Sequence, residues 1–291
     1  MNRILLITPA HNESQLLHRL LEAVSCQDLL PKEWVIIDDS STDGTLEIAR
    51  EFAKSHYFVR LITTVRPGGH SFGSKARAFN FAIQGLDLDK FDFIGNLDAD
   101  ISVSSNYLSS IARMFACNPQ LGIAGGRVFT KNGRRFISYD NSLHSVAGAV
   151  QMFRVQCFRD IGASYLDLPF GGIDAAAEIL ARMNGWQVKK NPDLHAYEHR
   201  MTGTASTGLI SSRYRLGRRF NSLGYSALFQ LLRCLSRISD APPVLGSFAE
   251  IVGYFRARIS GEGPILEPDV VQFLRSEQRN RLRAPWSQNR Q

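Results

Sequence analysis

Short apolar runs alternate with amphipathic segments along the first third of this chain. The apolar runs are typical of buried strands, and the segments between them repeat apolar residues at helical spacing. Strands that alternate with helices favour a parallel sheet with helices on both faces. In such sheets ligands bind beyond the carboxyl ends of the strands. We expect strands at residues 4–8, 34–37, 59–64 and 91–97, and helices at 14–25, from 45 onward and at 75–83.

Two aspartates follow the fourth of these strands directly. In an extended backbone Asp98 and Asp100 would share one face, and Ala99 would point away from it. Such a carboxylate pair can hold Mn²⁺ or Mg²⁺ that already carries substrate phosphates. Paired aspartates at a strand end can also form a solvated turn without any ligand. The pair therefore predicts a nucleotide diphosphate site only if further polar motifs lie at the same edge of the sheet.

The strand–helix alternation stops after a helix expected at residues 105–117. Strands are then expected at 121–129, 136–139, 149–155 and 186–189, with a helix at 173–184. Residues 194–199 and a loop of small residues at 201–206 close this body. The pattern beyond is helical, at 209–220, 222–238, 245–259 and 269–283. We therefore predict an α/β domain over residues 1–205 and a helical, arginine-rich extension over residues 206–291.

Four polar motifs lie at strand ends and helix starts in the α/β body. They are Pro9-Ala10-His11-Asn12-Glu13, residues 37–45 with Asp38-Asp39, Lys75-Ala76-Arg77-Ala78-Phe79-Asn80, and Leu97-Asp98-Ala99-Asp100. In this order and at this spacing the motifs resemble glycosyltransferase family 2, the inverting nucleotide-sugar enzymes of the GT-A fold. The resemblance covers residues 3–205.

The resemblance implies both a fold and a reaction. The fold is a GT-A fold, Rossmann-like, with a mostly parallel central sheet and helices on both faces, here followed by the helical extension. The reaction moves a sugar from a nucleotide-diphosphate sugar, with a UDP-sugar favoured, to an acceptor hydroxyl in bacterial cell-surface polysaccharide or glycolipid biosynthesis. The acceptor is expected to be a saccharide or lipid-linked. The Gln-x-x-Arg-Trp motif of processive synthases is absent from the sequence, which favours transfer of single sugars.

The same resemblance assigns the nucleotide site. It implies that the first turn and Asp38-Asp39 hold the nucleoside, because carboxylates accept hydrogen bonds from base N–H and ribose hydroxyl groups. Lys75 and Arg77 lie at the start of the helix expected at 75–83. A bound diphosphate would explain cations at this position, although they can also be solvated charges. The aspartates of the second motif could instead form turns and cap the next helix, the reading favoured for Asp43. The predicted nucleotide-binding residues are Pro9, Ala10, Asn12, Glu13, Asp38, Asp39, Lys75, Arg77, Asn80 and Asp98.

The general base is expected at Asp174. Family members usually carry Glu-Asp at this point, with a glycine and an aromatic residue closing the helix, and Gly185-Trp186 reproduces that spacing. Ile173 replaces the usual glutamate, so Asp174 is the motif's remaining carboxylate. It would take the proton from the acceptor hydroxyl during attack on the anomeric carbon. An ordinary helix N-cap aspartate is the alternative, and Glu178 is the spare candidate base.

A late histidine completes the predicted metal site. In related GT-A enzymes a histidine near a loop rich in glycine and threonine can reach the metal or the diphosphate, and His199 fits this role, as does Arg200. The metal ligands predicted are therefore Asp98, Asp100 and His199. A structural histidine is an equal alternative, whereas a zinc pair with His195 is disfavoured because Pro192 favours an extended segment. The loop at 201–206 could close over the donor.

The charge of the chain is concentrated at its end. Residues 1–199 hold 20 Lys+Arg against 21 Asp+Glu, whereas residues 200–291 hold 14 arginines against 6 acidic residues, a net charge of +8. The arginines at 213, 215, 218 and 219 precede a leucine-rich stretch, so the extension could lie on an anionic membrane surface. It could equally pack on the body with its arginines solvated. No nucleic acid partner is expected.

Four scattered cysteines and the lack of a membrane-length apolar run favour a cytoplasmic protein, either free or peripheral on the inner face of the cell membrane. Three other functions remain open from the sequence. A nucleotidyltransferase is disfavoured because no glycine-rich, lysine-containing turn follows Thr8. A non-catalytic nucleotide- or sugar-binding protein and a membrane-surface scaffold of the same fold are the other two. The missing glutamate at position 173 keeps the non-catalytic reading open.

Overall fold

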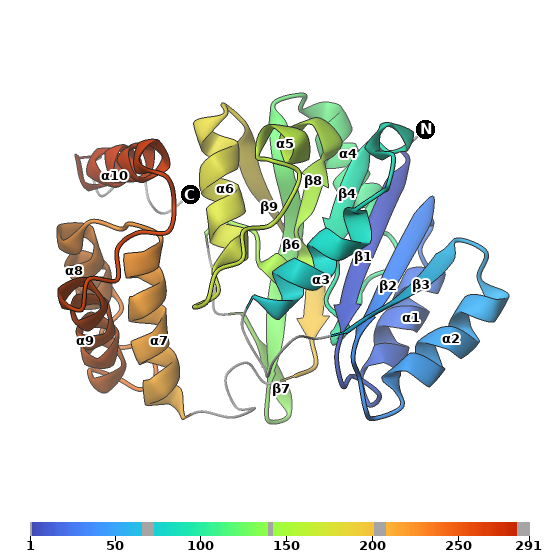
Figure 1. Ribbon diagram of the computed structural model, residues 1–291, viewed down its shortest axis with the longest axis horizontal. Helices are drawn as coiled ribbons and strands as arrows, with labels where there is room; N and C mark the ends of the chain where they lie inside the picture. The colour runs from blue at the N-terminus through green and yellow to red at the C-terminus, as the bar shows by residue number, and fades with distance from the viewer. Residues whose placement is uncertain (1, 66–72, 139–141, 201–207, 284–291) are drawn as a thin grey trace. The chain divides into compact units, whose positions relative to one another are not determined.

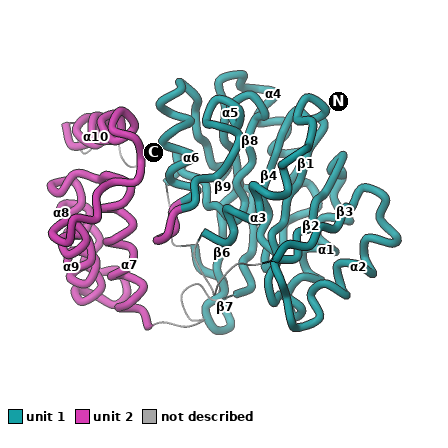
Figure 2. The backbone as a smooth tube through the Cα atoms, in the orientation of Figure 1, with its two compact units in different colours: residues 1–167, 173–201 teal, residues 168–172, 202–291 magenta. Residues whose placement is uncertain are grey.

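The structure is a computed structural model that describes residues 2–65, 73–138, 142–200 and 208–283. It divides into two compact units, the first made of residues 1–167 and 173–201, the second of residues 168–172 and 202–291 (Figure 2). The domain boundary expected between residues 205 and 206, like the loop expected at 201–206, lies outside the described residues.

The first unit is built on one mixed sheet (Figure 1). In the described part of the chain nine strands form it, in the order β3-β2-β1-β4-β8-β6-β9-β5, with β7 paired to β6. Their bounds are β1 (Ile4–Ala10), β2 (Glu33–Asp39), β3 (Val59–Thr64), β4 (Phe93–Asn96), β5 (Ile101–Val103), β6 (Leu121–Asn132), β7 (Arg135–Ile137), β8 (Met152–Arg154) and β9 (Gln187–Glu198).

The N-terminal half of this sheet is parallel, as predicted. β1 pairs with β2 and with β4, and β2 pairs with β3, all in parallel register. Residues 4–7 and 34–37 are completely buried, which explains why these strands read as continuous apolar runs rather than alternating ones. Right-handed crossovers place α1 (Leu17–Ser25) and α2 (Thr45–Ser55) on one face, and α3 (Ser74–Ile83) on the other because it leads back past β1 to β4 (Figure 1).

The C-terminal half mixes directions. β8 lies antiparallel between β4 and β6, and β6 pairs in parallel with β9. The expected strand at 149–155 is shorter, since β8 spans three residues and a helix begins at Val155. The expected segments at 186–189 and 194–199 are one strand, with a register shift that follows Asn191 and so accommodates Pro192. The helical elements here are η1 (Leu88–Lys90), α4 (Tyr107–Cys117), η2 (Gly148–Val150), α5 (Val155–Asp160) and α6 (Ile173–Met183).

The described part of the second unit is helical. Its helices are α7 (Leu209–Ser222), α8 (Ala227–Ser236), α9 (Leu245–Ile259) and α10 (Pro268–Arg283). The helix expected at 222–238 begins later, because Gly224 adopts a left-handed conformation and Ser226 caps α8 by accepting a hydrogen bond from the Phe229 N–H. No helix among the described residues is both long enough and apolar enough to cross a bilayer.

Candidate functional site

The turns that follow β1 and β2 are tied together at the carboxyl edge of the sheet. The Asn12 side-chain oxygen accepts the Thr42 N–H at 2.9 Å, and the Glu13 N–H donates to Thr45 Oγ1 at 2.7 Å. His11 Nδ1 lies 2.7 Å from the Asp39 carbonyl oxygen. These bonds between neighbouring turns fix the side chains that the two turns present at the sheet edge.

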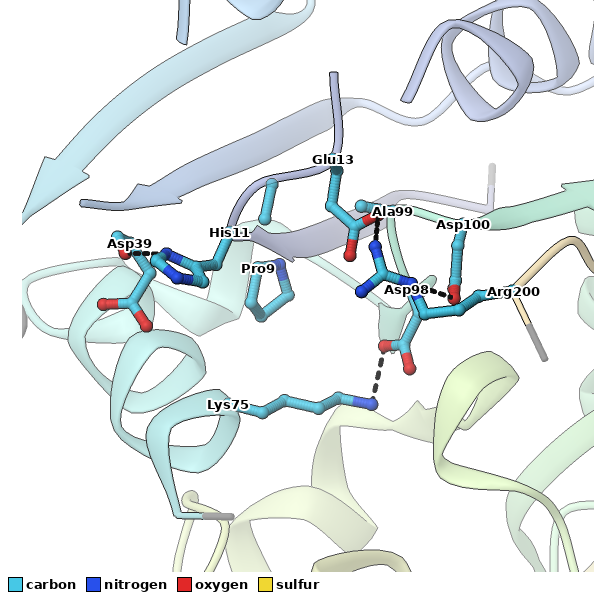
Figure 3. Close-up of a pocket in the computed structure, with 10 residues that line it drawn as sticks. Pro9, His11, Glu13, Asp39, Lys75, Asp98, Ala99, Asp100 and Arg200 are labelled. Carbon is cyan, nitrogen blue, oxygen red and sulfur yellow. Dashed lines mark hydrogen bonds and ion pairs between the residues drawn. The ribbon is translucent and has the colours of Figure 1, made fainter. Parts of the chain in front are cut away.

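A cavity of about 210 Å³ opens at this edge (Figure 3). It collects residues from β1, β2, the start of α3, the turn after β4 and the end of β9. The side chains that line it are Pro9, Ala10, His11, Glu13, Asp39, Lys75, Asp98, Ala99, Asp100 and Arg200. The structure therefore brings together seven of the predicted nucleotide and metal residues. It adds Arg200, which was expected beside His199, and two residues without an assigned role, His11 and Ala99.

The two aspartates of the fourth motif lie in a turn, not in a strand. β4 ends at Asn96, and the Ile101 N–H donates to the Asp98 carbonyl oxygen at 3.1 Å. The expectation that Asp98 and Asp100 share one face of an extended backbone, with Ala99 pointing away, is therefore wrong, because a short β5 starts at once and the chain must turn to reach it. Both carboxylates nevertheless line the cavity, and so does Ala99.

Lys75 reaches the first of these carboxylates from the start of α3 (Figure 3). Its Nζ lies 2.6 Å from Asp98 Oδ1 and donates to the Gly148 carbonyl oxygen at 3.0 Å. The Asn96 amide donates to the same two acceptors, at 2.8 and 2.6 Å. A cation is thus held at the cavity wall, in a position where it can also neutralise a phosphate.

Arg200 lies between the carboxylates of Glu13 and Asp100 (Figure 3). Its guanidinium forms an ion pair with Glu13, and its Nε lies 3.7 Å from Asp100 Oδ2. Burial raises the pKa of Asp100 to about 7, with Asp98, Glu198 and Glu13 adding to the rise and Arg200 opposing it. Burial also raises the pKa of Glu13. The pocket therefore holds more negative charge than its two cations compensate.

This donor set fits a hard divalent cation. Carboxylate oxygens are the ligands that Mg²⁺ and Mn²⁺ take, and Mg²⁺ is commonly held by one or two carboxylates together with substrate phosphates and water. Asp98 and Asp100 supply two such groups, and a bound cation would stabilise the ionised form of Asp100, which burial and the neighbouring carboxylates disfavour. Among the described residues no three acidic, histidine or cysteine side chains are grouped to hold a metal without such additional ligands.

His199 lies beside the cavity but not in its wall. Its N–H donates to the Asp100 carbonyl oxygen at 2.9 Å, its Nε2 lies 2.8 Å from Ser102 Oγ, and its ring meets Phe136 edge-on. Burial lowers the pKa of the imidazole. In the described structure the next residue, Arg200, is the one that reaches the cavity.

Asp38 carries an unusual carboxylate. It is buried at the end of β2, its Oδ2 accepts the Ser41 N–H at 3.2 Å, and its Oδ1 has no hydrogen-bond partner among the described residues. A buried acceptor without a donor is costly, so this atom is suited to a ligand N–H or hydroxyl group. Asp43, by contrast, has the turn role favoured for it, since it accepts from Ser14 and Thr45 and its pKa falls to about 2.

Two predicted nucleotide-binding residues of α3 point elsewhere. Arg77 forms an ion pair with Asp167 at 2.7 Å. Asn80 exchanges two hydrogen bonds with the backbone of Tyr165, at 2.7 and 2.8 Å. Arg77 and Asn80 do not line the described cavity, and neither do Asn12 and Asp38. In this structure Asn80 therefore holds the chain that leads into α6, and Lys75 is the residue of its motif that faces the site.

Asp174 is linked to the cavity through one residue, Gly148. It lies in the first turn of α6, and its Oδ2 accepts the Gly148 N–H at 3.2 Å. The carbonyl oxygen of Gly148 is the group that accepts from Lys75 and Asn96. The predicted base thus lies next to the cavity wall without lining it. Glu178, one turn further along, is buried and accepts the Val146 N–H at 2.5 Å, which favours a structural role.

The sequence profile of Glycosyl transferase family 2 matches residues 5–171 of this chain. The chain belongs to this family. The match begins in β1 and covers all four polar motifs, so it includes every residue that lines the cavity except Arg200.

Curated relatives support the same assignment. Poly-beta-1,6-N-acetyl-D-glucosamine synthase of Staphylococcus epidermidis is 25% identical over 223 residues, which are 66% of this chain and 52% of the relative. O-antigen biosynthesis protein RfbC of Myxococcus xanthus is 34% identical over 122 residues, 41% of this chain and 9% of the relative. The chain thus spans about half the length of the synthases it matches.

Solved structures share the fold. TarS of S. aureus (residues 1–349, with UDP-GlcNAc) superposes with a TM-score of 0.57 at 16% identity, covering 89% of this chain and 73% of that one. Mannosyltransferase PcManGT from Pyrobaculum calidifontis (with GDP-Man and Mn²⁺) gives 0.56 at 18% identity, covering 96% and 80%. At these identities the likeness concerns the fold, which is the GT-A fold predicted for this family 2 chain.

Three cavity residues, His11, Ala99 and Arg200, are not among the predicted nucleotide-binding residues and metal ligands, although Arg200 was expected near the metal or the diphosphate. The first two lie inside motifs that were recognised, so position within the motif was the available signal. Arg200 was considered with His199, but only the pairing of β9 with β5 decides which of the two side chains faces the cavity.

Proposed function

We propose that this family 2 chain is an inverting glycosyltransferase that moves a sugar from a nucleotide-diphosphate sugar to an acceptor hydroxyl. One observation carries the proposal: two carboxylates and a lysine line one cavity at the carboxyl edge of a parallel sheet, where the end of β2 also carries a buried, unpartnered carboxylate oxygen. The curated relatives support a place in bacterial cell-surface polysaccharide or glycolipid biosynthesis. The acceptor is then a saccharide or a lipid-linked sugar.

Each group has a separate part in this reaction. Asp38 and Asp39 accept hydrogen bonds from the nucleoside, and Lys75 binds the diphosphate. Asp98 and Asp100 would hold Mn²⁺ or Mg²⁺, which supplies positive charge to the departing diphosphate. The anomeric carbon gains a bond to the acceptor oxygen as its bond to the diphosphate oxygen breaks, and the acceptor's proton passes to the Asp174 carboxylate. Attack from the side opposite the leaving group inverts the anomeric carbon.

Ile173 does not weaken this proposal. The side chain at position 173 is 7% exposed, whereas Asp174, half-buried, bonds to the Gly148 peptide beside the cavity. The carboxylate that the motif retains is therefore the one connected to Lys75 and Asp98. A non-catalytic nucleotide- or sugar-binding protein of the same fold is the second candidate, and it predicts donor binding without turnover.

Two further parts of the proposal concern donor and location. A UDP-sugar is the favoured donor. The UDP-GlcNAc bound to TarS is compatible with a UDP-sugar, whereas the GDP-Man bound to PcManGT is compatible with a GDP-sugar. We also propose a cytoplasmic enzyme that acts peripherally at an anionic membrane. The four cysteines, all described, are free thiols, which suits a reducing compartment.

Thermal unfolding of the purified chain tests the donor site. UDP, GDP and dTDP are compared, each with and without Mn²⁺, for the native chain and for Asp100→Asn. We expect one nucleotide to raise the unfolding midpoint only with metal, and Asp100→Asn to lose the shift. A metal-dependent shift of equal size in Asp100→Asn would refute the metal assignment. Absence of any shift would refute the donor site. The non-catalytic candidate would be favoured if a nucleotide binds but no nucleotide sugar releases its nucleotide in the presence of acceptors.

A further inference from the structure

The helix α9 presents apolar side chains to solvent and small or polar ones to its neighbours. Leu245, Phe248, Val252 and Ile259 recur at helical spacing on one side, and Phe248 is 64% exposed. The side chains that α9 buries are Gly246, Ser247, Ala249, Glu250, Gly253, Tyr254 and Ala257. A helix on the surface of a protein in water normally has the opposite arrangement, with its apolar stripe turned inward.

The preceding helix has the same inverted arrangement. Leu228, Leu232 and Leu235 share one side of α8 and are all exposed, with Leu228 at 62%. The residues that α8 buries are Gln230 and Cys234, and Gln230 has no exposed surface at all. Two consecutive helices therefore turn leucine and phenylalanine outward and an amide, a thiol and a carboxylate inward.

Polar bonds and close backbone packing hold these helices together. Gln230 Nε2 donates to Glu250 Oε1 at 2.8 Å, and Arg233 forms an ion pair with the same carboxylate. A Cβ atom on Gly217 of α7 would lie 1.9 Å from the Glu250 carbonyl oxygen of α9, so only glycine allows this approach. Small residues and buried polar bonds, rather than apolar side chains, are typical of contacts between helices in lipid.

The two apolar stripes are continuous along the chain. The segment that joins α8 to α9 begins beyond Leu235 with Ile238 and ends with Val244, and both of these side chains are exposed. The Val244 N–H donates to the Ile238 carbonyl oxygen at 2.8 Å, which brings the two ends of the segment together. The end of one stripe and the beginning of the other therefore meet. A contiguous exposed apolar surface of this kind marks a binding site.

The charge around this surface indicates its partner. Residues 226–260 contain four arginines and two acidic residues, and both acidic residues are already in ion pairs with arginine. Arg256 and Arg258 are exposed in the last turns of α9, next to the exposed Ile259. The helices are not spanning segments. An apolar face flanked by cations fits the interface of an anionic phospholipid bilayer, where helices lie in the membrane plane.

The arginines of α7, from which a membrane surface was first suspected, have other partners. Arg213 lies 3.5 Å from Glu250, Arg218 forms an ion pair with Glu262 at 2.7 Å, and Arg219 donates to the Phe170 carbonyl oxygen at 3.0 Å. Leu223, the first leucine after these arginines, is completely buried. These contacts of α7 therefore give no support for a lipid-binding role of its arginines, whereas the exposed apolar side chains of α8 and α9 do point to such a role.

We propose that the apolar surface of α8 and α9, formed by Leu228, Leu232, Leu235, Leu245, Phe248 and Val252, inserts into the interface of an anionic phospholipid membrane. This inference rests on the membrane partner in the proposed function and names the residues that bind it. It would place the enzyme at the surface where lipid-linked acceptors reside. Membrane binding requires no sugar transfer, so the two proposals can fail separately.

Flotation with vesicles tests the inference on the full chain. The vesicles contain phosphatidylcholine alone or with phosphatidylglycerol. The test variant is Leu245→Ser/Phe248→Ser, and the matched control is Tyr57→Ser/Val65→Ser, which changes two side chains of the first unit that are 94% and 90% exposed. We expect the native chain and the control to bind the phosphatidylglycerol vesicles, and the test variant to bind at least about tenfold more weakly. High salt and Arg256→Gln should both weaken binding.

Three results would overturn the inference. The native chain could fail to bind anionic vesicles, or the test variant could bind as well as the control. The third result is self-association. Light scattering would show a dimer that only the test variant loses, and the native chain would not bind vesicles. The surface would then join two copies of the chain. All substituted side chains are exposed, so unfolding midpoints should stay close to native. The nucleotide-dependent shift of each variant then reports separately on the donor site.

Discussion

Replacing Glu178 with glutamine should remove a pH dependence from the stability of the first unit. The Glu178 carboxylate is buried in α6, where its Oε1 accepts the Val146 N–H at 2.5 Å and Ser145 Oγ lies 3.3 Å away. Burial raises the pKa of this group to about 8, and the nearby Asp174 adds to the rise. Glutamine keeps the acceptor oxygen for Val146 and cannot ionise.

The sign and size of the effect follow from this raised pKa. In the unfolded chain the carboxyl group ionises near 4.5, so between about pH 4.5 and about pH 8 the folded state binds the extra proton. The stability contributed by the protonated Glu178 is therefore complete below about pH 4.5, falls as the pH rises, and is lost at about pH 8. At about 1.4 kcal/mol per pH unit, the native chain should lose about 2–3 kcal/mol relative to Glu178→Gln between pH 5 and pH 7.

Urea unfolding at several pH values measures this difference. All other titrating groups, Asp100 included, are common to both chains, so the native-minus-variant difference isolates Glu178. Each unfolding free energy should come from a complete transition with an unchanged slope. A difference that stays constant from pH 5 to pH 8 would refute the reasoning. It would mean that Glu178 is ionised throughout, because Arg182, 3.7 Å away, and the Val146 N–H together outweigh its burial.

The remaining predictions concern the base, the lysine and the helical unit. Asp174→Asn keeps an acceptor for the Gly148 N–H, so the nucleotide affinity measured by calorimetry should stay near native. The rate of sugar transfer should fall by about a hundredfold or more. Retained turnover would contradict the assignment of Asp174 as the base. Lys75→Met should weaken nucleotide binding about tenfold because the diphosphate loses a cation, and equal affinity would remove Lys75 from the site. Gly217→Ala should cost the second unit about 1–3 kcal/mol of unfolding free energy, whereas Gly263→Ala, a control in open space, should cost far less.

The parallel half of the fold could be predicted because its signals are local. Residues 59–64 form β3 as expected, and the runs at 4–8 and 34–37 lie inside β1 and β2. Each run is apolar because both faces of a parallel sheet are covered. The carboxyl ends of these strands meet at one edge, so Asp39 and Asp98 could be assigned to one site although many residues separate them.

The second half of the site depends on pairings that leave no local signal. Arg200 enters the cavity because β9 pairs with β5, with Glu198 opposite Ile101, and because the His199 N–H bonds to the Asp100 carbonyl oxygen. β5 is three residues long, too short for a periodic pattern to reveal it. Periodicity likewise predicted helices over the residues of α8 and α9, but it cannot say which side of such a helix faces solvent.

One residue, Gly148, connects the two chemical halves of the proposed reaction. The Gly148 carbonyl oxygen accepts from Lys75, which also contacts Asp98, and the Gly148 N–H donates to Asp174. A Cβ atom at position 148 would lie 3.1 Å from that of Asp174, so a side chain there would crowd the base. The backbone at this point is held in turn by Glu178 through Val146. The proposed diphosphate site and the proposed base therefore share a support, and a shift of residues 146–148 should disturb both at once.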